Sequence, residues 1–198
     1  LSLIISENRV VFINTLGDVS SVDIQSGDLL WQTPTQSSAI YENSFSLKNS
    51  DLISEKNSIY FSNNKNEFFA LDERTGIIKW KQTLNSNLRP TYADGLVFTV
   101  TLEGYLVVID SRNGNIVRMT NIFEQIKKYK KNNIKPEGFI VARDEIYLSL
   151  NNGKLIIIDI KTGKSKNILK IDNGKISRPY VLNNNMYIVR DNSIIKLN

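Results

Sequence analysis

The sequence predicts an all-β fold, a β-propeller of four-stranded antiparallel blades, of which about five are present out of an expected eight. Three observations lead to this prediction. One short motif recurs four times along the 198 residues. The copies are separated by about the length of one propeller blade. Each copy follows two short strands joined by a turn, which is the pattern of an antiparallel hairpin.

The recurring motif consists of an apolar strand, an Asp, two variable residues, Ser, Thr or Asn, then Gly and a second strand. Its four copies are Ser20–Trp31, Phe69–Trp80, Val107–Arg118 and Ile156–Asn167. Because the Asp stands at positions 23, 72, 110 and 159, successive copies are 49, 38 and 49 residues apart. A unit of about 40 residues, lengthened twice by an insertion, fits a propeller blade.

Each position that recurs in the four copies of the motif has a structural explanation. The Asp is expected to end its strand and to accept backbone N–H bonds across the turn. The Gly is expected to supply the positive φ angle that a tight hairpin requires. Trp31 and Trp80 end the outer strand in two copies, and we expect them to pack on the neighbouring blade. The structural residues of the repeat are therefore Asp23, Gly27, Trp31, Asp72, Gly76, Trp80, Asp110, Gly114, Asp159 and Gly163.

A second hairpin precedes each motif copy and completes the blade. The clearest case runs from Gly95 to Asp110, where two apolar strands flank a Leu-Glu-Gly turn. A short first strand is expected after Pro90, Pro136 and Pro179, since proline is tolerated at the start of a strand. The expected blades cover residues 1–33, 45–84, 89–120, 136–170 and 176–198, with insertions at 34–44 and 119–135.

The last blade is expected to stop after three strands, because the chain ends where the motif Asp would fall. The first blade offers no spare strand to complete it. We therefore expect this chain to be the C-terminal part of a longer protein, with further blades before Leu1.

The composition excludes several common classes of catalytic and metal site. The chain has neither His nor Cys, so these residues cannot form a Ser–His or Cys–His nucleophile, a zinc finger or an iron–sulfur cluster. The sequence contains no run of 18 apolar residues, so it predicts no transmembrane helix. The net charge of +5 fits scattered solvated lysines, and equally a nucleic acid, an anionic membrane surface or an acidic protein as partner.

The segment from Leu71 to Leu84, LDERTGIIKWKQTL, resembles the repeat of the pyrroloquinoline-quinone (PQQ) family. That family includes PQQ-dependent dehydrogenases and BamB, an outer-membrane protein assembly lipoprotein. A dehydrogenase would need a Ca²⁺ ion held by carboxylate and amide groups, a catalytic Asp, a Trp floor and often a Cys pair. The chain has no Cys, and its motif Asp and Trp residues have structural roles. We therefore expect no catalytic residue, no metal site and no cofactor.

A second stretch, Ser44 to Trp80, resembles the BamB segment that begins with its partner-binding loop. The loop pattern of that family, S-L-S-L-R-G, contacts the barrel subunit BamA. The matching residues here are Phe45, Leu47 and Lys48, with Asn49 in place of Gly. The family also uses an acidic D-x-D pair, where this chain has Asn85 and Asn87. The resemblance implies partner-binding roles at these positions, although Lys lacks the planar fork of Arg and both acidic charges are missing.

The loop also stands out without the resemblance. Residues 34–50 exceed a simple link between blades, and long loops on rigid scaffolds often carry function. Phe45 and Leu47 are either exposed anchors in a polar rim or inward-facing residues of an ordinary first strand. The sequence leaves these two alternatives open.

The insertion at 119–135 breaks the β pattern. Ile122, Ile126 and Tyr129 share one face of a short helix, beside lysines at 127, 128, 130 and 131. Such a helix is either a docked connector or a peripheral contact with anionic lipid or an acidic partner. No pattern of aromatic and basic residues indicates binding to nucleic acid.

The resemblance to BamB implies a non-catalytic scaffold of outer-membrane β-barrel assembly, a periplasmic, lipid-anchored protein that binds BamA and assists outer-membrane proteins to fold and insert. Unfolded outer-membrane proteins could add a strand to an exposed blade edge, and exposed edges also predict a homodimer of the fragment. The alternative is a fragment of a PQQ-dependent dehydrogenase or of another periplasmic PQQ-like binding protein.

Overall fold

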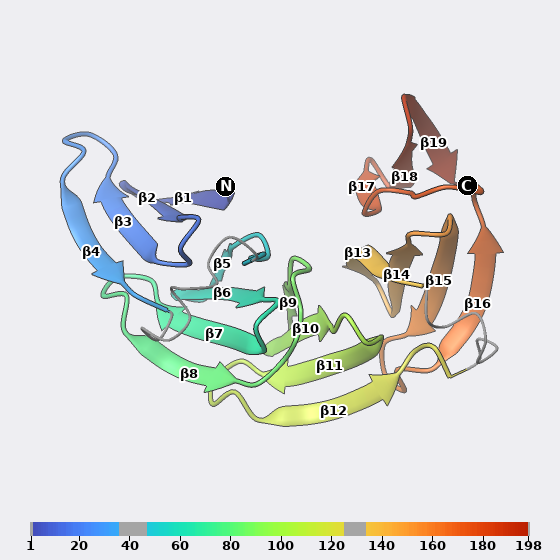
Figure 1. The fold of residues 1–198 in the computed structure, drawn as a ribbon, viewed down its shortest axis with the longest axis horizontal. Helices are drawn as coiled ribbons and strands as arrows, with labels where there is room; N and C mark the ends of the chain where they lie inside the picture. Colours follow the sequence, from blue (N-terminus) through green and yellow to red (C-terminus); the bar gives the residue numbers. More distant parts are fainter. Residues whose placement is uncertain (1, 36–46, 125–133, 198) are drawn as a thin grey trace. The chain divides into compact units, whose positions relative to one another are not determined.

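The computed structural model describes residues 2–35, 47–124 and 134–197. These residues form nineteen strands in five sheets and no helix (Figure 1). Each sheet follows the chain as a simple meander, in which every strand lies beside the next one in sequence. The structure thereby confirms the predicted all-β fold of four-stranded propeller blades, with three strands in the last sheet.

The five sheets are referred to as blades 1 to 5, in chain order. Blade 1 contains β1 (Ser2–Ser6), β2 (Arg9–Ile13), β3 (Val19–Asp23) and β4 (Leu29–Thr33). Blade 2 contains β5 (Ile53–Glu55), β6 (Ser58–Asn63), β7 (Glu67–Asp72) and β8 (Ile78–Gln82). Blade 3 contains β9 (Thr91–Ala93), β10 (Leu96–Val100), β11 (Tyr105–Asp110) and β12 (Ile116–Asn121). Blade 4 contains β13 (Pro136–Ala142), β14 (Glu145–Leu150), β15 (Lys154–Asp159) and β16 (Ser165–Lys170), and blade 5 contains β17 (Tyr180–Leu182), β18 (Asn185–Arg190) and β19 (Ser193–Leu197).

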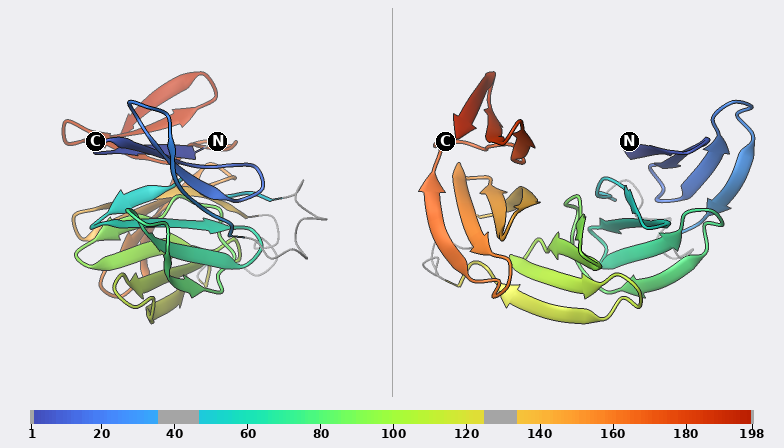
Figure 2. Two further views of the ribbon diagram at one scale, coloured as in Figure 1. Left: turned by 90° about the vertical axis from the view of Figure 1, so that its left-hand side faces the viewer. Right: turned by 180° about the vertical axis from the view of Figure 1, so that it is seen from behind.

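The chain divides into two compact units. Unit 1 contains residues 1–97 and 109–115, and unit 2 contains residues 98–108 and 116–198. Blades 1 and 2 belong to unit 1, blades 4 and 5 belong to unit 2, and the strands of blade 3 are divided between them. Figure 2 shows the meander of each blade from two further directions.

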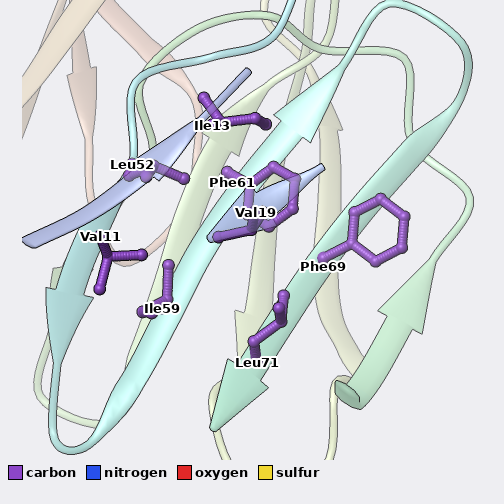
Figure 3. Packing of buried hydrophobic residues seen from close by; sticks show 8 residues of the cluster. All are labelled: Val11, Ile13, Val19, Leu52, Ile59, Phe61, Phe69 and Leu71. Atoms are coloured by element: carbon purple, nitrogen blue, oxygen red, sulfur yellow. The ribbon is translucent and has the colours of Figure 1, made fainter. Parts of the chain in front are cut away.

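The core of unit 1 lies between blades 1 and 2. Blade 1 contributes Val11, Ile13 and Val19, and blade 2 contributes Leu52, Ile59, Phe61, Phe69 and Leu71, all nearly inaccessible to solvent (Figure 3). Alternate residues of a strand point to opposite faces, so β2 and β6 each direct every second side chain into this layer. Burying a side chain of this size contributes about 1.5–3 kcal/mol. Blade 2 is covered on both faces, since all six residues of β6 are buried.

In unit 2, blades 4 and 5 share a smaller core. Leu155, Ile176 and Ile188 are fully buried, and Tyr147, Leu169, Ile171, Met186 and Leu197 pack around them. The strands pair in antiparallel register, for example Ile146 with Ile158 in β14 and β15. The apolar runs predicted as strands therefore form the interior of both units.

The motif turns have the hydrogen bonds and backbone angles expected from the sequence. Oδ1 of Asp23 accepts the backbone N–H groups of Gln25 and Ser26, each at 2.9 Å. The same side-chain atom accepts N–H groups two or three residues later at Asp72, Asp110 and Asp159. The motif glycines have φ between 72° and 78°. Each turn is thus closed by its own carboxylate and depends on a residue that tolerates positive φ.

The outer strand of one blade is tied to the motif turn of the next blade. In unit 1, Nε1 of Trp31 donates to the carbonyl of Glu73, and Oγ1 of Thr33 donates to the carbonyl of Gly76 at 2.7 Å. The following junction repeats this pair of bonds with Trp80 to Ser111 at 2.9 Å and Gln82 to Gly114 at 2.7 Å. The expectation that both Trp side chains pack on the neighbouring blade is thereby confirmed.

Unit 2 uses a different side chain at the same repeat position. Arg118 stands where the other two copies have Trp, and its guanidinium donates to the carbonyls of Ile160, at 2.6 Å, and Lys161. Thr120, two residues later, lies against Gly163. The shared requirement at all three junctions is therefore a donor for the carbonyls of the next motif turn.

The structure corrects one boundary of the predicted insertions. Met119, Thr120 and Asn121 continue strand β12 rather than opening the expected helix. Ile122, expected on a helical face, is buried and donates its N–H to the carbonyl of Gly104 at 3.0 Å. Ile126, Tyr129 and the four lysines of the insertion lie outside the described residues.

Candidate functional site

The candidate site lies at one end of the blades. At this end, the segment that follows the outer strand of a blade contacts the turn between the second and third strands of the same blade. In unit 1, Oγ1 of Thr35 donates to the carbonyl of Gly17 at 2.5 Å, and the N–H of Ser86 donates to the carbonyl of Asn63 at 3.3 Å. In both cases the accepting residue belongs to the turn between the second and third strands, or to its edge. The links are thereby held at this end of the blade.

Residues 47–50, the described part of the long loop, are fastened to the β6–β7 turn. The backbone N–H of Lys48 donates to Oδ1 of Asn64 at 2.8 Å, and the N–H of Asn64 donates to the carbonyl of Lys48 at 3.1 Å. The N–H of Ser50 then donates to the carbonyl of Ser62 at 2.8 Å. We call the reciprocal pair of bonds between Lys48 and Asn64 the Lys–Asn clasp.

Asn63 brings the two predicted partner-binding segments together. It forms an isolated bridge with Asn49 of the loop, and its carbonyl accepts the N–H of Ser86. This buried residue therefore contacts both the segment that follows Leu47 and Lys48 and the segment that contains Asn85 and Asn87. Two segments that are far apart in the sequence thus meet at one turn.

The exposure of the predicted residues differs. The side chain of Lys48 is exposed, Leu47 is half-buried, and Asn85 and Asn87 are half-buried on either side of the buried Ser86. Leu47 also precedes the first strand of its blade, which begins at Ile53. An ordinary first strand is therefore not formed at Leu47. Phe45 lies outside the described residues.

The charges around the turn leave a cationic surface. Glu67 is buried and is neutralised by Lys81, with 2.7 Å between Oε1 and Nζ, while its Oε2 accepts from Nδ2 of Asn63 at 2.8 Å. Within the described parts of the chain, Lys48 and Lys65 form no ion pair. Their ammonium groups are therefore available to an acidic group of a partner.

Sequence reasoning missed the residues that organise this site, Asn63 and Asn64. Their signal was present as the Asn-rich run from Asn63 to Asn66 between two apolar strands. The pattern predicts a turn. It carries no information about which distant segments the turn would bind.

The Lys–Asn clasp recurs in unit 2. The N–H of Lys135 donates to Oδ1 of Asn151 at 2.9 Å, and the N–H of Asn151 donates to the carbonyl of Lys135 at 3.0 Å. The two residues are 16 positions apart in both copies. The backbone position of Lys48 is thus a structural feature of the repeat, and its side chain is exposed.

Hydrogen bonds at the motif turns lower the pKa values of the motif carboxylates. The hydrogen bond and charge of Arg112 lower the pKa of Asp110 to about 2. The backbone N–H of Thr162, followed by its side-chain hydroxyl, lowers the pKa of Asp159. Each of these shifts comes from a bond that closes the turn. These carboxylates are therefore occupied as turn acceptors.

The described residues contain no group of three or more acidic side chains arranged to hold a metal ion. The carboxylate of Glu145 accepts from Lys166 Nζ at 2.6 Å and from the Tyr147 hydroxyl at 2.5 Å. Burial, together with this bond to the carboxylate, raises the pKa of Tyr147 to about 12. The tyrosine is thus a donor in a surface network.

Among the residues that the structure describes, none belongs to a helix with the length and apolar character needed to cross a membrane.

Comparison with known proteins gives one family match and many similar folds. The family model described as outer membrane protein assembly factor BamB matches residues 1–120. The outer membrane protein assembly factor BamB of Legionella pneumophila (strain Paris) is 22% identical over 155 residues, which cover 77% of this chain and 35% of that protein. The chain therefore matches about a third of the length of this relative.

Two solved structures illustrate the fold. BamB from Moraxella catarrhalis is similar with a TM-score of 0.59 and 14% identity, over 98% of this chain and 70% of that chain. A europium-containing methanol dehydrogenase is similar with a TM-score of 0.71 and 11% identity, over 95% of this chain and 48% of that chain. At such identities the likeness shows the fold alone, which scaffolds and enzymes share.

Proposed function

Since the chain belongs to the family of outer membrane protein assembly factor BamB, we propose that it is a non-catalytic scaffold of outer-membrane β-barrel assembly. In this proposal it works in the periplasm at the inner face of the outer membrane, as part of a protein that carries a lipid anchor. It binds the barrel subunit BamA and thereby assists outer-membrane proteins to fold and insert. Recognition of another protein is its whole activity.

The observation that carries this proposal is the convergence of two segments at Asn63. Leu47 and Lys48 come from one side of blade 2, and Asn85 and Asn87 come from the link that leaves it. A half-buried Leu beside an exposed Lys offers an apolar contact within a polar rim, which is the usual composition of a protein interface. Backbone bonds to Asn64 hold the segment in place before a partner arrives, which reduces the entropy lost on binding.

The partner surface is expected to be acidic opposite Lys48. The side chain of this lysine has no ion pair within the described residues, and Lys65 adds a second positive charge on the same turn. A single exposed charge pair contributes modestly to affinity and more to the rate and specificity of encounter. Leu47 is expected to supply most of the binding energy of this segment.

The proposal is tested by replacing Leu47 with Ala and Lys48 with Glu, and by measuring co-purification with BamA. We expect the double variant to lose most of the bound subunit. Lys135→Glu is the matched control, because Lys135 is exposed and has the same backbone clasp in unit 2. The control should bind as the parent chain does. Unchanged binding by the double variant, with its melting temperature preserved, would remove this segment from the interface.

Asn85 and Asn87 offer an independent test of the second segment. Where the family has an acidic pair, this chain has two uncharged amides of nearly the same shape. Replacing both with Asp restores the charges with little change in volume. If BamA faces this segment, its affinity for the variant must differ from its affinity for the parent chain. The affinity should rise where BamA presents a basic residue and fall where it presents an acidic one. An unaltered affinity across a range of salt concentrations argues that BamA does not contact these residues.

The non-catalytic part of the proposal has its own measurement. A PQQ-dependent enzyme gains stability from its cofactor by mass action. We expect the melting temperature of this chain to stay constant when PQQ and Ca²⁺ are added together. A rise that saturates with PQQ concentration would instead favour a quinoprotein.

A further inference from the structure

One end of blade 4 carries a row of lysines. In this antiparallel sheet, the start of β13, the start of β15 and the end of β16 lie at the same end. Lys135 directly precedes β13, Lys154 begins β15 and Lys170 ends β16. Because neighbouring strands lie about 4.8 Å apart, the three positions span roughly 14 Å across the sheet. We call these three residues, which all belong to unit 2, the lysine row.

Two lysines of the row lie side by side. Lys154 and Lys170 are directly opposite each other in the register of β15 and β16. Like charges at such opposite positions repel each other, because their Cβ atoms are only about 5 Å apart. Nζ of Lys170 donates to the carbonyl of Asn152 at 2.9 Å. The N–H of Lys135 donates to Oδ1 of Asn151, so the β14–β15 turn lies within the row.

The neighbouring carboxylates are already paired with other cations. Glu137 of β13 pairs with Lys175, with 2.6 Å between Oε2 and Nζ. Asp172, which follows β16, pairs with Arg190 at 3.4 Å. Within the described residues, no lysine of the row forms an ion pair. The row therefore keeps three positive charges.

The same repeat position has a different charge in the other blades. Five residues before the motif Asp, blades 1, 2 and 3 have Asp18, Glu67 and Tyr105, and blade 4 has Lys154. In blade 2, Glu67 neutralises Lys81 of the outer strand at a distance of 2.7 Å. In blade 4, the basic residue faces a second basic residue instead. The accumulation of positive charge is therefore a property of blade 4 and not of the repeat.

Blade 4 exposes no large apolar side chain to a partner. In the described residues 134–170, every large hydrophobic side chain is buried or half-buried, whereas each of the other four blades has exposed ones. A stable protein interface usually has an apolar or aromatic centre within a polar rim. An anionic bilayer instead attracts clustered lysines through charge alone. This contrast favours a lipid surface over an acidic protein.

We propose that the lysine row is a contact site for the phosphate groups of an anionic phospholipid surface. A lysine ammonium is a compact point charge, which suits phosphate groups that move within a bilayer. A phosphate between Lys154 and Lys170 would also relieve the repulsion of their ammonium groups. Both of these lysines belong to strands and not to the basic insertion. The inference does not depend on binding to BamA, and its test contains no BamA.

Binding to lipid vesicles tests the proposal. The chain is sedimented with vesicles of phosphatidylglycerol and phosphatidylcholine, and separately with vesicles of phosphatidylcholine alone. The test variant carries Lys154→Gln and Lys170→Gln, which remove two charges and keep most of the aliphatic length. The matched control carries Lys161→Gln and Lys164→Gln. These two lysines are exposed, form no ion pair within the described residues and lie at the opposite end of β15.

We expect the test variant to bind the anionic vesicles roughly 25-fold more weakly, since each lysine near such a surface contributes about a factor of five. The control should change the affinity by less than about twofold, because its lysines lie roughly 20 Å from the row and the Debye length is about 8 Å. Replacing Lys154 and Lys170 with Arg should preserve binding. The melting temperature of the test variant should be at least that of the parent chain, because the substitutions remove a repulsive pair.

Several outcomes would overturn the proposal. Equal binding by the test variant and the parent chain would mean that the row does not contact the lipid. An equal loss in the control would assign binding to the net charge of the chain. Equal binding to vesicles of phosphatidylcholine alone would exclude recognition of anionic lipid. If the parent chain bound a polyglutamate peptide but no vesicles, and the test variant lost that binding, the partner would be an acidic protein.

Discussion

The blade junctions of the two units are closed by different side chains at the same repeat position. In unit 1 the indoles of Trp31 and Trp80 lie on a motif Gly and each donates one N–H to a carbonyl. In unit 2 Arg118 donates to two carbonyls of the next turn, and Thr120 lies on the Gly. All three junctions share a side-chain donor to the carbonyls of the next motif turn, and the two junctions of unit 1 have an apolar ring in addition.

This difference separates two contributions to stability. The carbonyls of the motif turn need donors wherever a neighbouring blade excludes water, because an unpaired buried acceptor is costly. The Trp ring adds burial of apolar surface, which grows with the area removed from water. Trp80 also stacks on Phe68, with 5.9 Å between the ring centroids. We therefore expect the junctions with Trp to be the more sensitive to substitution.

The largest effect is expected from Trp80→Ala. The side chain is only 8% exposed and contacts Phe68 and Tyr60. Its removal leaves a cavity and an unpaired Ser111 carbonyl, and should lower the free energy of unfolding by about 3–5 kcal/mol. Urea unfolding followed by the fluorescence of the remaining Trp31 measures the loss within unit 1. A loss below that of an ordinary surface substitution would contradict the packing role.

The next largest effect is expected from Gly76→Ala, compared with Gly27→Ala. Both residues have positive φ, which costs an L-residue roughly 1–2 kcal/mol. At Gly76 the new methyl group also collides with Trp31, and relieving such overpacking costs roughly a further 1–3 kcal/mol. The difference between the two variants in thermal unfolding isolates the contribution of the Trp. If both variants lost the same stability, the Trp31 ring would move aside without a measurable free-energy penalty.

A smaller effect is expected from Arg118→Met, which removes both donors and keeps much of the aliphatic length. Because Arg118 and Ile160 are only half-buried, water can reach the released carbonyls, so the loss should be about 0.5–1.5 kcal/mol. Hydrogen exchange of the turn at residues 159–163 measures it locally. Arg118→Trp should retain more protection than Arg118→Met, because an indole restores one donor. The reverse order would contradict the importance of the donor.

The smallest effect is expected from acid, through the motif turns that all junctions share. Because the pKa of Asp110 falls from 3.8 to about 2 in the folded chain, its contribution to stability is present above pH 3.8 and is lost as the pH falls towards 2. Thermal unfolding at several pH values over this range measures the loss. Asp110→Asn should be less sensitive to acid in this window, and an identical decline would contradict the assignment.

The extent of the blades was predictable because each is made of local hairpins. The alternation of apolar residues, the motif Asp and the Gly with positive φ act within a few residues, so the sequence predicted the strands and the turns that the structure contains. The prediction was wrong at Met119–Asn121, where an outer strand continues and residues with little apolar alternation are held by their neighbours. Tertiary pairing decides such cases.

The candidate site was predictable only in part. The resemblance indicated Leu47, Lys48, Asn85 and Asn87, but nothing in the sequence related the two segments to each other. Their meeting depends on bonds from backbone N–H groups to Asn63 and Asn64, and any residue except proline can provide such a donor. Main-chain bonds of this kind leave little trace in the choice of side chain.

The sequence alone therefore determined the propeller class, the strands of each blade and the chemistry of the motif turns, because these depend on contacts between near neighbours in the chain. Only the tertiary structure decided that Arg118 takes the place of a Trp as donor and that one turn binds both of the segments predicted to contact a partner. These features join residues of different strands, turns and links that are not neighbours in the sequence. They become visible only when the blades lie against each other.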